Sequence, residues 1–162
     1  MKNKKLFFFF FYYLYENAVI YNSSDYIFEI LVNPDKELLY SKKYKKKENK
    51  ELKSKIFKSI KNINFIRKLN FYNRGTLFEK KVWEQIAKIP FGKVLSYGKI
   101  AFRMNMKGYQ AVGRACGKNY FPLVIPCHRV VSKNGIGGYS AGVNIKKKLL
   151  RFEGANISES MC

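Results

Sequence analysis

The second half of the chain carries apolar residues at helical spacing. Thr76-x-x-Glu79 is typical of a capped helix start, and apolar residues then recur every three or four positions. Pro90 and Gly92 end the pattern, because proline interrupts helical hydrogen bonding. We predict a helix here whose buried face consists of Phe78, Val82, Ile86 and Ile89.

Two short helices are predicted next. Ser96 can cap the first, which extends to about Met104, and a turn with Gly108 leads to the second at residues 110–116. Such a pair is typical of a helix-turn-helix, in which the second helix enters a DNA groove, although many helix pairs merely pack together. The second helix has little bulk, which fits close approach to another surface. Its small residues are Ala111, Gly113 and Ala115.

The rest of this half combines a strand, a motif-bearing segment and a last helix. Residues 123–125 are an apolar run that predicts a short buried strand. The run leads into residues 126–131, which contain the only histidine, and then into a glycine-rich loop at 135–142. A final helix is expected over residues 144–152, and residues 153–154 close it. Its predicted inner face consists of Ile145, Leu149 and Phe152.

The first forty residues predict strands. Residues 6–15 form an apolar, aromatic run, and residues 26–32 form a second candidate strand. The run at 6–15 follows lysines as a signal peptide does, but no small-residue cleavage site follows it, and a membrane span needs about 20 residues. Secretion is therefore the less favoured alternative. Residues 42–61 are lysine-rich and end in a predicted basic amphipathic helix, and residues 62–74 are a predicted linker.

The change of character near residue 75 predicts two domains. Residues 1–74 would form a small strand-rich N-terminal domain with the basic helix and the linker. Residues 75–162 would form a helical C-terminal domain that carries the helix-turn-helix. We therefore expect the α/β fold class, of the α+β kind.

The charge of the chain indicates a polyanionic partner. The 162 residues include 32 Lys and Arg against 11 Asp and Glu, a formal net charge of +21, and nucleic acid is the first candidate. The alternative is that the lysines merely decorate a solvated surface. Three cysteines without a CxxC pair and a single histidine exclude a zinc finger or a disulfide scaffold. We expect no metal and a reducing compartment.

Cys127 is the candidate nucleophile. A cysteine after an apolar run is usually a small buried hydrophobe, but Pro126 fixes the backbone before this one and His128 and Arg129 follow it. Neighbouring imidazole and guanidinium groups favour the thiolate, which is the reactive form. Because adjacent residues rarely face each other, we expect His128 to reach Cys127 through a water. Glu153 is the best placed of the few carboxylates to orient the imidazole.

A rival motif does not fit the chain. Residues 138–142 match the G-x-S-x-G elbow of serine hydrolases. In that elbow the histidine lies downstream of the serine, whereas His128 precedes Ser140 and no Asp follows. We therefore discount a serine nucleophile.

The segment Pro126-Cys127-His128-Arg129-Val130 resembles the active-site signature of the O6-methylguanine-DNA methyltransferases. The resemblance extends over about residues 75–154, half of the chain. The N-terminal half matches only in kind, and it lacks the Cys and His that bind structural zinc in some members. The further residues that match the family's pattern are Gly75, Thr76, Phe78, Val82, Trp83, Ile89, Pro90, Gly92, Ser96, Tyr97, Ala111, Val112, Gly113, Asn119, Gly138, Tyr139, Ser140, Lys146, Leu149, Leu150 and Glu153.

The resemblance implies direct repair of alkylated DNA. The damaged guanine would be flipped out of the duplex into a pocket, because its alkyl carbon is unreachable within the stack. Cys127 would then take the alkyl group from the O6 atom once and irreversibly, with no cofactor. His128 would act as the water-mediated base, oriented by Glu153.

The resemblance also implies supporting roles. Asn119 would brace the turn before the site, Tyr97 would hydrogen-bond the flipped guanine, and Lys146 would help protonate the leaving base. The residues expected to bind the substrate base are Val130, Tyr139, Ser140 and Ala141. Those expected to contact DNA are Gln110, Ala111, Gly113, Arg114, Cys116 and Arg129. For Cys116, a packing role is an equal alternative.

Two positions depart from the family's pattern. Gln110 stands where Arg is common before Ala-Val-Gly, and Ala141 stands where Gly is common, which would narrow the pocket for bulky adducts. The expected partner is double-stranded DNA, bound through its minor groove by a monomer. We expect no membrane, and a location in the cytoplasm of a bacterium or the nucleus of a eukaryote. The alternatives are a lesion-binding protein without transfer, against which Cys127 argues, and a helix-turn-helix regulator, which would leave the Cys-His-Glu set unexplained.

If the basic residues contact phosphates, DNA affinity should fall steeply with salt, because each neutralised phosphate releases counterions. We expect log affinity to fall against log salt with a slope of about −0.9 per phosphate contacted, with little sequence preference. Fluorescence anisotropy at several salt concentrations measures this slope. An affinity that barely changed between low and physiological salt would mean that the lysines are only solvated surface.

Overall fold

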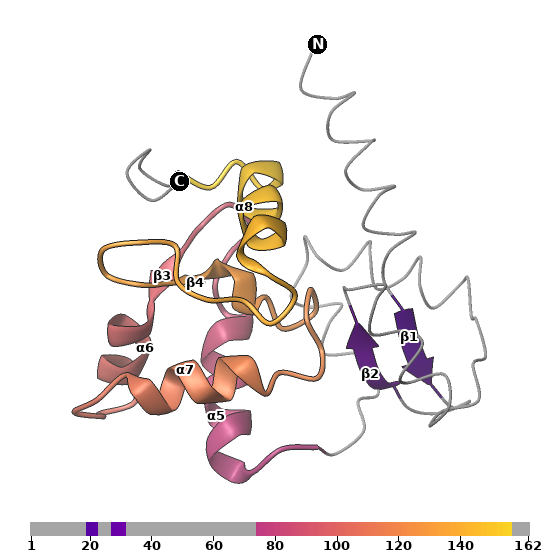
Figure 1. Ribbon diagram of the computed structural model, residues 1–162. Coiled ribbons are helices and arrows are strands. Elements are labelled where there is room, and N and C mark those ends of the chain that lie inside the picture. Colours follow the sequence, from indigo (N-terminus) through magenta and orange to yellow (C-terminus); the bar gives the residue numbers. More distant parts are fainter. Residues whose placement is uncertain (1–18, 23–26, 32–73, 157–162) are drawn as a thin grey trace. The chain divides into compact units, whose positions relative to one another are not determined.

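The computed structural model describes residues 19–22, 27–31 and 74–156 (Figure 1). The chain divides into two units, Met1–Asn73 and Arg74–Cys162. The predictions for the aromatic run at 6–15, for the lysine-rich segment at 42–61 and for nearly all of the linker at 62–74 lie outside the described residues.

The first unit contains an antiparallel pair of strands. Strand β1 spans Val19–Asn22 and strand β2 spans Ile27–Leu31, with Ile20 opposite Ile30 and a register shift after Tyr21. Strand β2 lies within the predicted strand at 26–32, so that prediction is confirmed.

Helix α5 spans Leu77–Ala87 and begins with the predicted capping box. The Glu79 N–H donates to Thr76 Oγ1 at 3.2 Å, and the Thr76 N–H donates to Glu79 Oε2 at 2.8 Å, so each side chain satisfies a free amide of the first turn. The predicted place of Phe78 on the buried face is wrong, because its side chain is 37% exposed. The buried face is rotated away from it and consists of Glu79, Val82, Trp83 and Ile86.

Helices α6 and α7 confirm the two short helices predicted from the sequence. Helix α6 spans Tyr97–Arg103 and is capped by Ser96, whose hydroxyl accepts from the Lys99 N–H at 3.2 Å. Helix α7 spans Gln110–Gly117, and both helices pack against α5.

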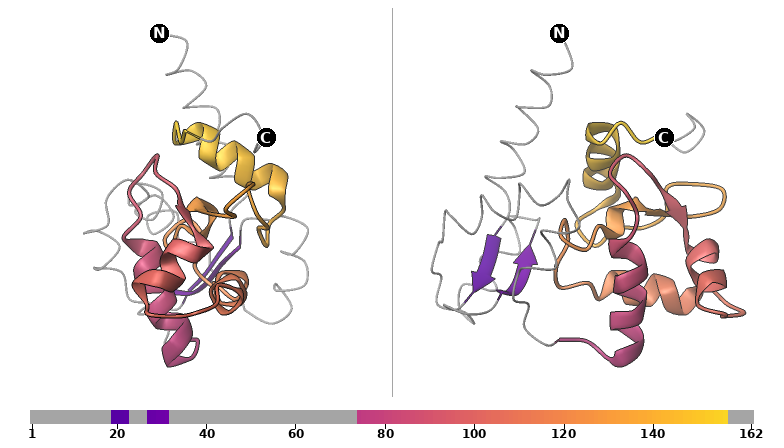
Figure 2. Two further views of the ribbon diagram at one scale, coloured as in Figure 1. Left: turned by 90° about the vertical axis from the view of Figure 1, so that its left-hand side faces the viewer. Right: turned by 180° about the vertical axis from the view of Figure 1, so that it is seen from behind.

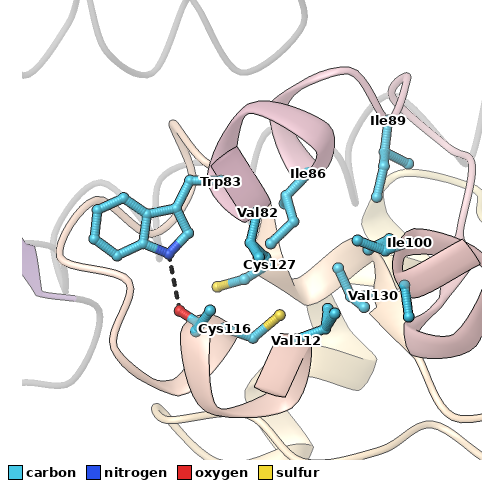
Figure 3. Close-up of a cluster of buried hydrophobic side chains, with 11 residues drawn as sticks. Val82, Trp83, Ile86, Ile89, Ile100, Val112, Cys116, Cys127 and Val130 are labelled. Carbon is cyan, nitrogen blue, oxygen red and sulfur yellow. Dashed lines mark hydrogen bonds between the residues drawn. The ribbon is translucent and has the colours of Figure 1, made fainter. Parts of the chain in front are cut away.

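The core of this unit joins these helices to the segment that carries Cys127. The Trp83 indole N–H donates to the Ala115 carbonyl at 2.8 Å, which ties α5 to α7 inside the cluster (Figure 3). Ala101 and Ala115 complete the cluster whose other members Figure 3 labels: Val82, Trp83, Ile86, Ile89, Ile100, Val112, Cys116, Cys127 and Val130.

The strand predicted at residues 123–125 is wrong, because the chain forms a turn there. Pro122 and Pro126 remove two N–H donors that a strand ladder would need. Leu123 adopts a φ of 74°, and the Ile125 N–H donates to the Phe121 carbonyl at 2.8 Å. The result is a compact loop instead of an extended one.

Pro126 then sets the backbone that presents Cys127. Its φ of −80° and ψ of 64° are those of an inverse γ-turn, and the Cys127 N–H donates to the Ile125 carbonyl at 2.8 Å. The short helix η2 follows at Cys127–Arg129. Strand β4, Val130–Val131, comes next and pairs in parallel with β3, Leu95–Ser96.

Helix α8, Val143–Phe152, confirms the predicted last helix. Its fully buried positions are Lys146 and Leu150, and Leu149 is nearly so, whereas Ile145 and Phe152 are half-buried. Helix α8 contacts η2, and in all three views the β3–β4 pair lies between α8 on one side and α7 on the other (Figures 1 and 2). This unit therefore combines helices with a small parallel sheet, and Cys127, the candidate nucleophile, belongs to its buried core.

Candidate active site

Cys127 occupies a buried position at the start of η2, with 4% of its surface exposed. The side-chain amide of Asn119 donates to its Sγ at 3.1 Å. Burial raises the pKa of the Cys127 thiol, while the Asn119 amide and the positive charge of Lys146 act in the opposite direction. The thiol is therefore protonated at neutral pH, so it would need a base to form the reactive thiolate.

Asn119 holds the turn that precedes Cys127. Its Nδ2 also donates to the Ile125 carbonyl at 2.8 Å, and its Oδ1 accepts from the Phe121 N–H at 2.9 Å. One side chain thus connects the end of α7 to the loop and to the sulfur.

His128 and Glu153 form a buried pair. The distance between His128 Nε2 and Glu153 Oε1 is 2.7 Å, and the two side chains are 0% and 1% exposed. Burial lowers the pKa of His128, so its imidazole is neutral, although Glu153 pulls in the other direction. Because an ionised carboxylate can only accept, Nε2 carries the hydrogen and Nδ1 carries the lone pair.

The Glu153 carboxylate is the centre of a larger cluster. Arg129 donates to it from Nε at 2.8 Å and from Nη2 at 2.9 Å, and the Gly92 N–H donates to Oε2 at 3.1 Å. Burial alone would raise the pKa of Glu153, but the hydrogen bonds from His128 and Arg129 and the positive charge of Arg129 outweigh burial and lower it to about 2. The carboxylate is therefore ionised under all ordinary conditions.

The prediction that Arg129 contacts DNA is wrong. Its side chain is buried, and its remaining nitrogen Nη1 donates to the Ile89 carbonyl at 2.7 Å. A buried carboxylate requires a compensating charge, and Arg129 supplies that charge to Glu153 instead of to a phosphate.

Lys146 and Tyr97 lie close together beside the thiol. Lys146 is fully buried, and its amino group donates to the carbonyls of Val130 and Gly138, the latter at 3.0 Å. The amino nitrogen lies 5.9 Å from the centre of the Tyr97 ring. Burial lowers the pKa of Lys146 to about 8 and raises that of Tyr97 to about 12, so both groups can donate a proton at neutral pH.

A pocket of about 270 Å³ opens beside the sulfur. It is slightly smaller than the range of about 300–1,000 Å³ that is common for drug-sized ligands, and this size suits a single ring system. The residues that line it are Tyr97, Gly113, Cys116, Gly117, Cys127, Gly138, Tyr139 and Ser140.

The pocket brings together many of the residues predicted from the sequence and leaves others out. Of the four residues predicted to bind the substrate base, Tyr139 and Ser140 line the pocket, whereas Val130 and Ala141 do not. The carbonyl of Val130 accepts a hydrogen bond from Lys146. Gly117 and Gly138 line the pocket, although neither was predicted to bind substrate. Glycine carries no side chain that could have marked these two positions, and only their places beside the motifs could have indicated them.

Helix α7 has small residues on its outer face and carries one buried thiol. Gln110 and Arg114 are exposed, and Ala111 and Gly113 are half-buried, so all four remain candidates for contact with DNA. Cys116 is 8% exposed, belongs to the core and lines the pocket, so its predicted contact with DNA stays a prediction. The alternative of a packing role is the one that the structure supports.

These features define a class of site: a buried cysteine thiol that lines a pocket, beside a neutral imidazole held by a carboxylate, in a small domain of helices and a short parallel sheet. Comparison with known proteins narrows the class. A family model described as "6-O-methylguanine DNA methyltransferase, DNA binding domain" matches residues 77–155. The chain is 49% identical over 82 residues to the methylated-DNA--protein-cysteine methyltransferase of Saccharolobus islandicus, covering 51% of this chain and 54% of that one.

Solved structures point to the same family, and one of them covers most of the chain. The O6-methylguanine-DNA methyltransferase from the archaeon Pyrococcus kodakaraensis superimposes with a TM-score of 0.71 at 31% identity, covering 85% of this chain and 90% of that one. The Mycobacterium tuberculosis OGT in complex with DNA is 40% identical, with a TM-score of 0.50 and coverage of 52% and 53%. The chain belongs to the O6-methylguanine-DNA methyltransferase family. It spans between 47% and 63% of the length of the curated relatives that it matches.

The described part of the chain contains neither a metal-binding cluster nor a membrane-spanning helix. No three His, Cys, Asp or Glu side chains gather there in a way that could hold a metal ion. No helix within residues 74–156 has the length and apolar character of a membrane span.

Acid should destabilise the fold over a pH range that is set by the buried Glu153 and His128. The pKa of Glu153 is lowered from 4.5 to about 2, so its contribution to stability is complete above pH 4.5 and is lost as the pH falls towards 2. Protonation of His128, whose pKa is lowered from 6.5, acts in the same direction. We expect the free energy of unfolding to fall by about 3 kcal/mol through Glu153 alone, measured by denaturant titration at several pH values.

The Glu153→Gln variant isolates this contribution. It should be less stable than the parent protein at neutral pH and should lose much less stability between pH 4.5 and 2. Glu84→Gln is the matched control, because Glu84 is exposed on α5 and its variant should follow the parent curve. Parallel curves for Glu153→Gln and the parent would contradict the assignment of the charge to Glu153.

Proposed function

We propose that this protein repairs DNA by transferring the alkyl group of O6-alkylguanine to Cys127, once per molecule. The observation that carries the proposal is the position of the Cys127 thiol, which lines a pocket of about 270 Å³ and lies next in sequence to a base held by Glu153. In this proposal the protein is a methylated-DNA–protein-cysteine S-methyltransferase that needs no cofactor. The family membership supports the same activity.

The transfer is a displacement at the alkyl carbon. The thiol gives its proton to His128 through a water, and the thiolate attacks the carbon in line with the bond to O6. A C–S bond forms while the C–O bond breaks, and its electron pair passes to the guanine. Tyr97 and Lys146, which keep their protons at neutral pH, are the donors that neutralise the leaving base.

The damaged base must leave the duplex to reach Cys127, and α7 is the element proposed to enter the minor groove. Its outer face carries small side chains, and the space beside Gly113 is open, because an added Cβ there would meet no atom within 4 Å. Residues 74–156 contain 16 Lys and Arg against three Glu and no Asp, which favours a polyanionic partner. The M. tuberculosis OGT was solved in complex with DNA, and this likeness supports DNA as the partner here.

A lesion-binding protein without transfer is the second candidate. It would use the same pocket and the same α7 surface. The presence of Cys127, hydrogen-bonded by Asn119 and followed by the His128–Glu153 pair, favours transfer over mere binding.

Mass spectrometry of the intact chain and its peptides tests the proposal directly. After mixing with duplex DNA that contains O6-methylguanine, we expect one added methyl group per molecule, on the Cys127 peptide and not on Cys116 or Cys162. Cys127→Ser is the control and should stay unmodified. Tight lesion binding by the parent protein with an unmodified Cys127 would contradict transfer and leave the binding function.

Gln110 is expected to fill the gap that the flipped base leaves. Its exposed amide at the start of α7 has both a donor and an acceptor, so it can pair with the orphaned cytosine and offset part of the cost of flipping, a few kcal/mol. Gln110→Ala should slow methyl transfer from duplex DNA several-fold or more in a single-turnover assay. Reaction with free O6-benzylguanine needs no flipping and should hardly change. An equal loss in both reactions would mean that Gln110 supports the pocket instead.

A further inference from the structure

Two buried polar atoms near Cys127 have no hydrogen-bond partner among the described residues. They are His128 Nδ1 and the hydroxyl oxygen of Tyr139. The two rings meet edge to face, with centroids 6.4 Å apart and planes at 82°. Since buried polar groups are nearly always hydrogen-bonded, two such atoms on adjacent side chains require an explanation.

The two atoms are chemically complementary. His128 uses its Nε2 hydrogen on Glu153, so Nδ1 of the neutral ring is an acceptor. Burial keeps the pKa of Tyr139 well above its usual value, so its hydroxyl remains protonated and is a donor. Tyr139 and Cys127 also line the same pocket. A donor and an acceptor that both lack partners beside a thiol make a site for a small molecule that can accept and donate at once, which is water.

We propose that Tyr139 is a positioning residue, whose hydroxyl acts with His128 Nδ1 to hold one water against the sulfur of Cys127. This inference rests on the proposed function, in which the thiol reaches His128 through a water. The water oxygen would accept from the Tyr139 hydroxyl and from the thiol, and it would donate one hydrogen to Nδ1. Three hydrogen bonds are typical of a buried water.

Such a water completes the proton balance of thiol activation. The thiol proton passes to the water oxygen, and a water hydrogen passes to Nδ1, which leaves a thiolate and an imidazolium. The imidazolium is stabilised by the ionised Glu153 at 2.7 Å. The departing guanine takes a proton from Tyr97 or Lys146, and exchange with solvent restores both groups. The Tyr139 hydroxyl loses no proton, because its role is to fix the water.

The other charged and titratable groups near His128 and Tyr139 already have hydrogen-bond partners or belong to the pocket wall. Glu153 and Arg129 beside His128 are hydrogen-bonded to each other, and Lys146 donates to two backbone carbonyls. The remaining neighbours of the sulfur are Asn119, which donates to it, and the side chains of Cys116 and Tyr97 in the pocket wall. In the described part of the chain, Tyr139 supplies the donor that the water needs.

Tyr139→Phe tests the inference, because it removes only the hydroxyl and keeps the ring contact with His128. The first readout is the rate at which iodoacetamide alkylates Cys127 across a range of pH, followed on the Cys127 peptide by mass spectrometry. This reaction needs the thiolate but neither DNA nor a lesion. We expect Tyr139→Phe to react tenfold or more slowly at neutral pH and to match the parent at alkaline pH, where the thiol ionises without help.

Tyr120→Phe is the matched control. Tyr120 packs edge-on against Trp83 with centroids 6.1 Å apart and does not line the pocket, so its variant should follow the parent profile. An unchanged profile for Tyr139→Phe would overturn the inference. A rate lowered equally at every pH would also overturn it, because a packing defect does not depend on the ionisation of the thiol.

Single-turnover methyl transfer is the second readout and separates this inference from the proposed function. Slower transfer by Tyr139→Phe with unchanged affinity for lesion DNA supports both. If the parent protein takes no methyl group but the iodoacetamide profile still shifts in Tyr139→Phe, the proposed function fails and the role of Tyr139 stands. If the parent transfers and Tyr139→Phe equals it in both assays, only the role of Tyr139 fails.

Discussion

The buried carboxylate of Glu153 is the charge on which the site depends. It lies at the end of α8 and receives hydrogen bonds from η2 and from the Gly92 N–H in the loop after α5. Removing one partner from a buried ion pair costs about 3–5 kcal/mol, because the other charge is left uncompensated. The close fit extends to the backbone, since a Cβ at Gly92, where φ is 73°, would lie 2.7 Å from the Glu153 carbonyl oxygen. Three separate segments are therefore fixed around one charge.

That charge also divides the acid and base roles within the pocket. By accepting a hydrogen bond from Nε2–H, Glu153 fixes the tautomer of His128 and leaves Nδ1 as the acceptor. Tyr97, with a pKa of about 12, and Lys146, with a pKa of about 8, keep their protons at neutral pH. Pairs of groups whose surroundings push their pKa values apart are typical of sites that move a proton in one direction. In the proposed reaction the thiol would lose its proton to His128, while the leaving base would gain one from Tyr97 or Lys146.

The sequence predicted those parts of the fold that are set by local signals. Capping residues located α5 and α6, apolar spacing located α5 and α8, and the turn at Gly108 located α7, because such signals act over a few neighbouring residues. The apolar run at 123–125 was ambiguous between a strand and a turn, and only the prolines on either side of it carried the information that it would turn. For the segments outside the described residues, the predictions stay predictions.

The contacts within the site were harder to predict from the sequence than the helices were. The scarcity of acids after residue 76 made Glu153 a candidate, and the structure brings it to His128. Arg129 was assigned to DNA because a charge does not reveal, in sequence, that its partner is buried. The unpartnered hydroxyl of Tyr139 could not have been found from the sequence, because it depends on the three-dimensional arrangement.

The central claim is that the Glu153–His128 pair activates the Cys127 thiol for alkyl transfer. The most direct measurement is the single-turnover rate of methyl transfer by Glu153→Gln at neutral pH, with its fold and its affinity for lesion DNA measured in parallel. Loss of a positioned base typically costs a factor of about 10²–10⁴, so we expect a decrease of at least about a hundredfold with binding retained. A folded Glu153→Gln variant that transfers the methyl group as fast as the parent would contradict the account.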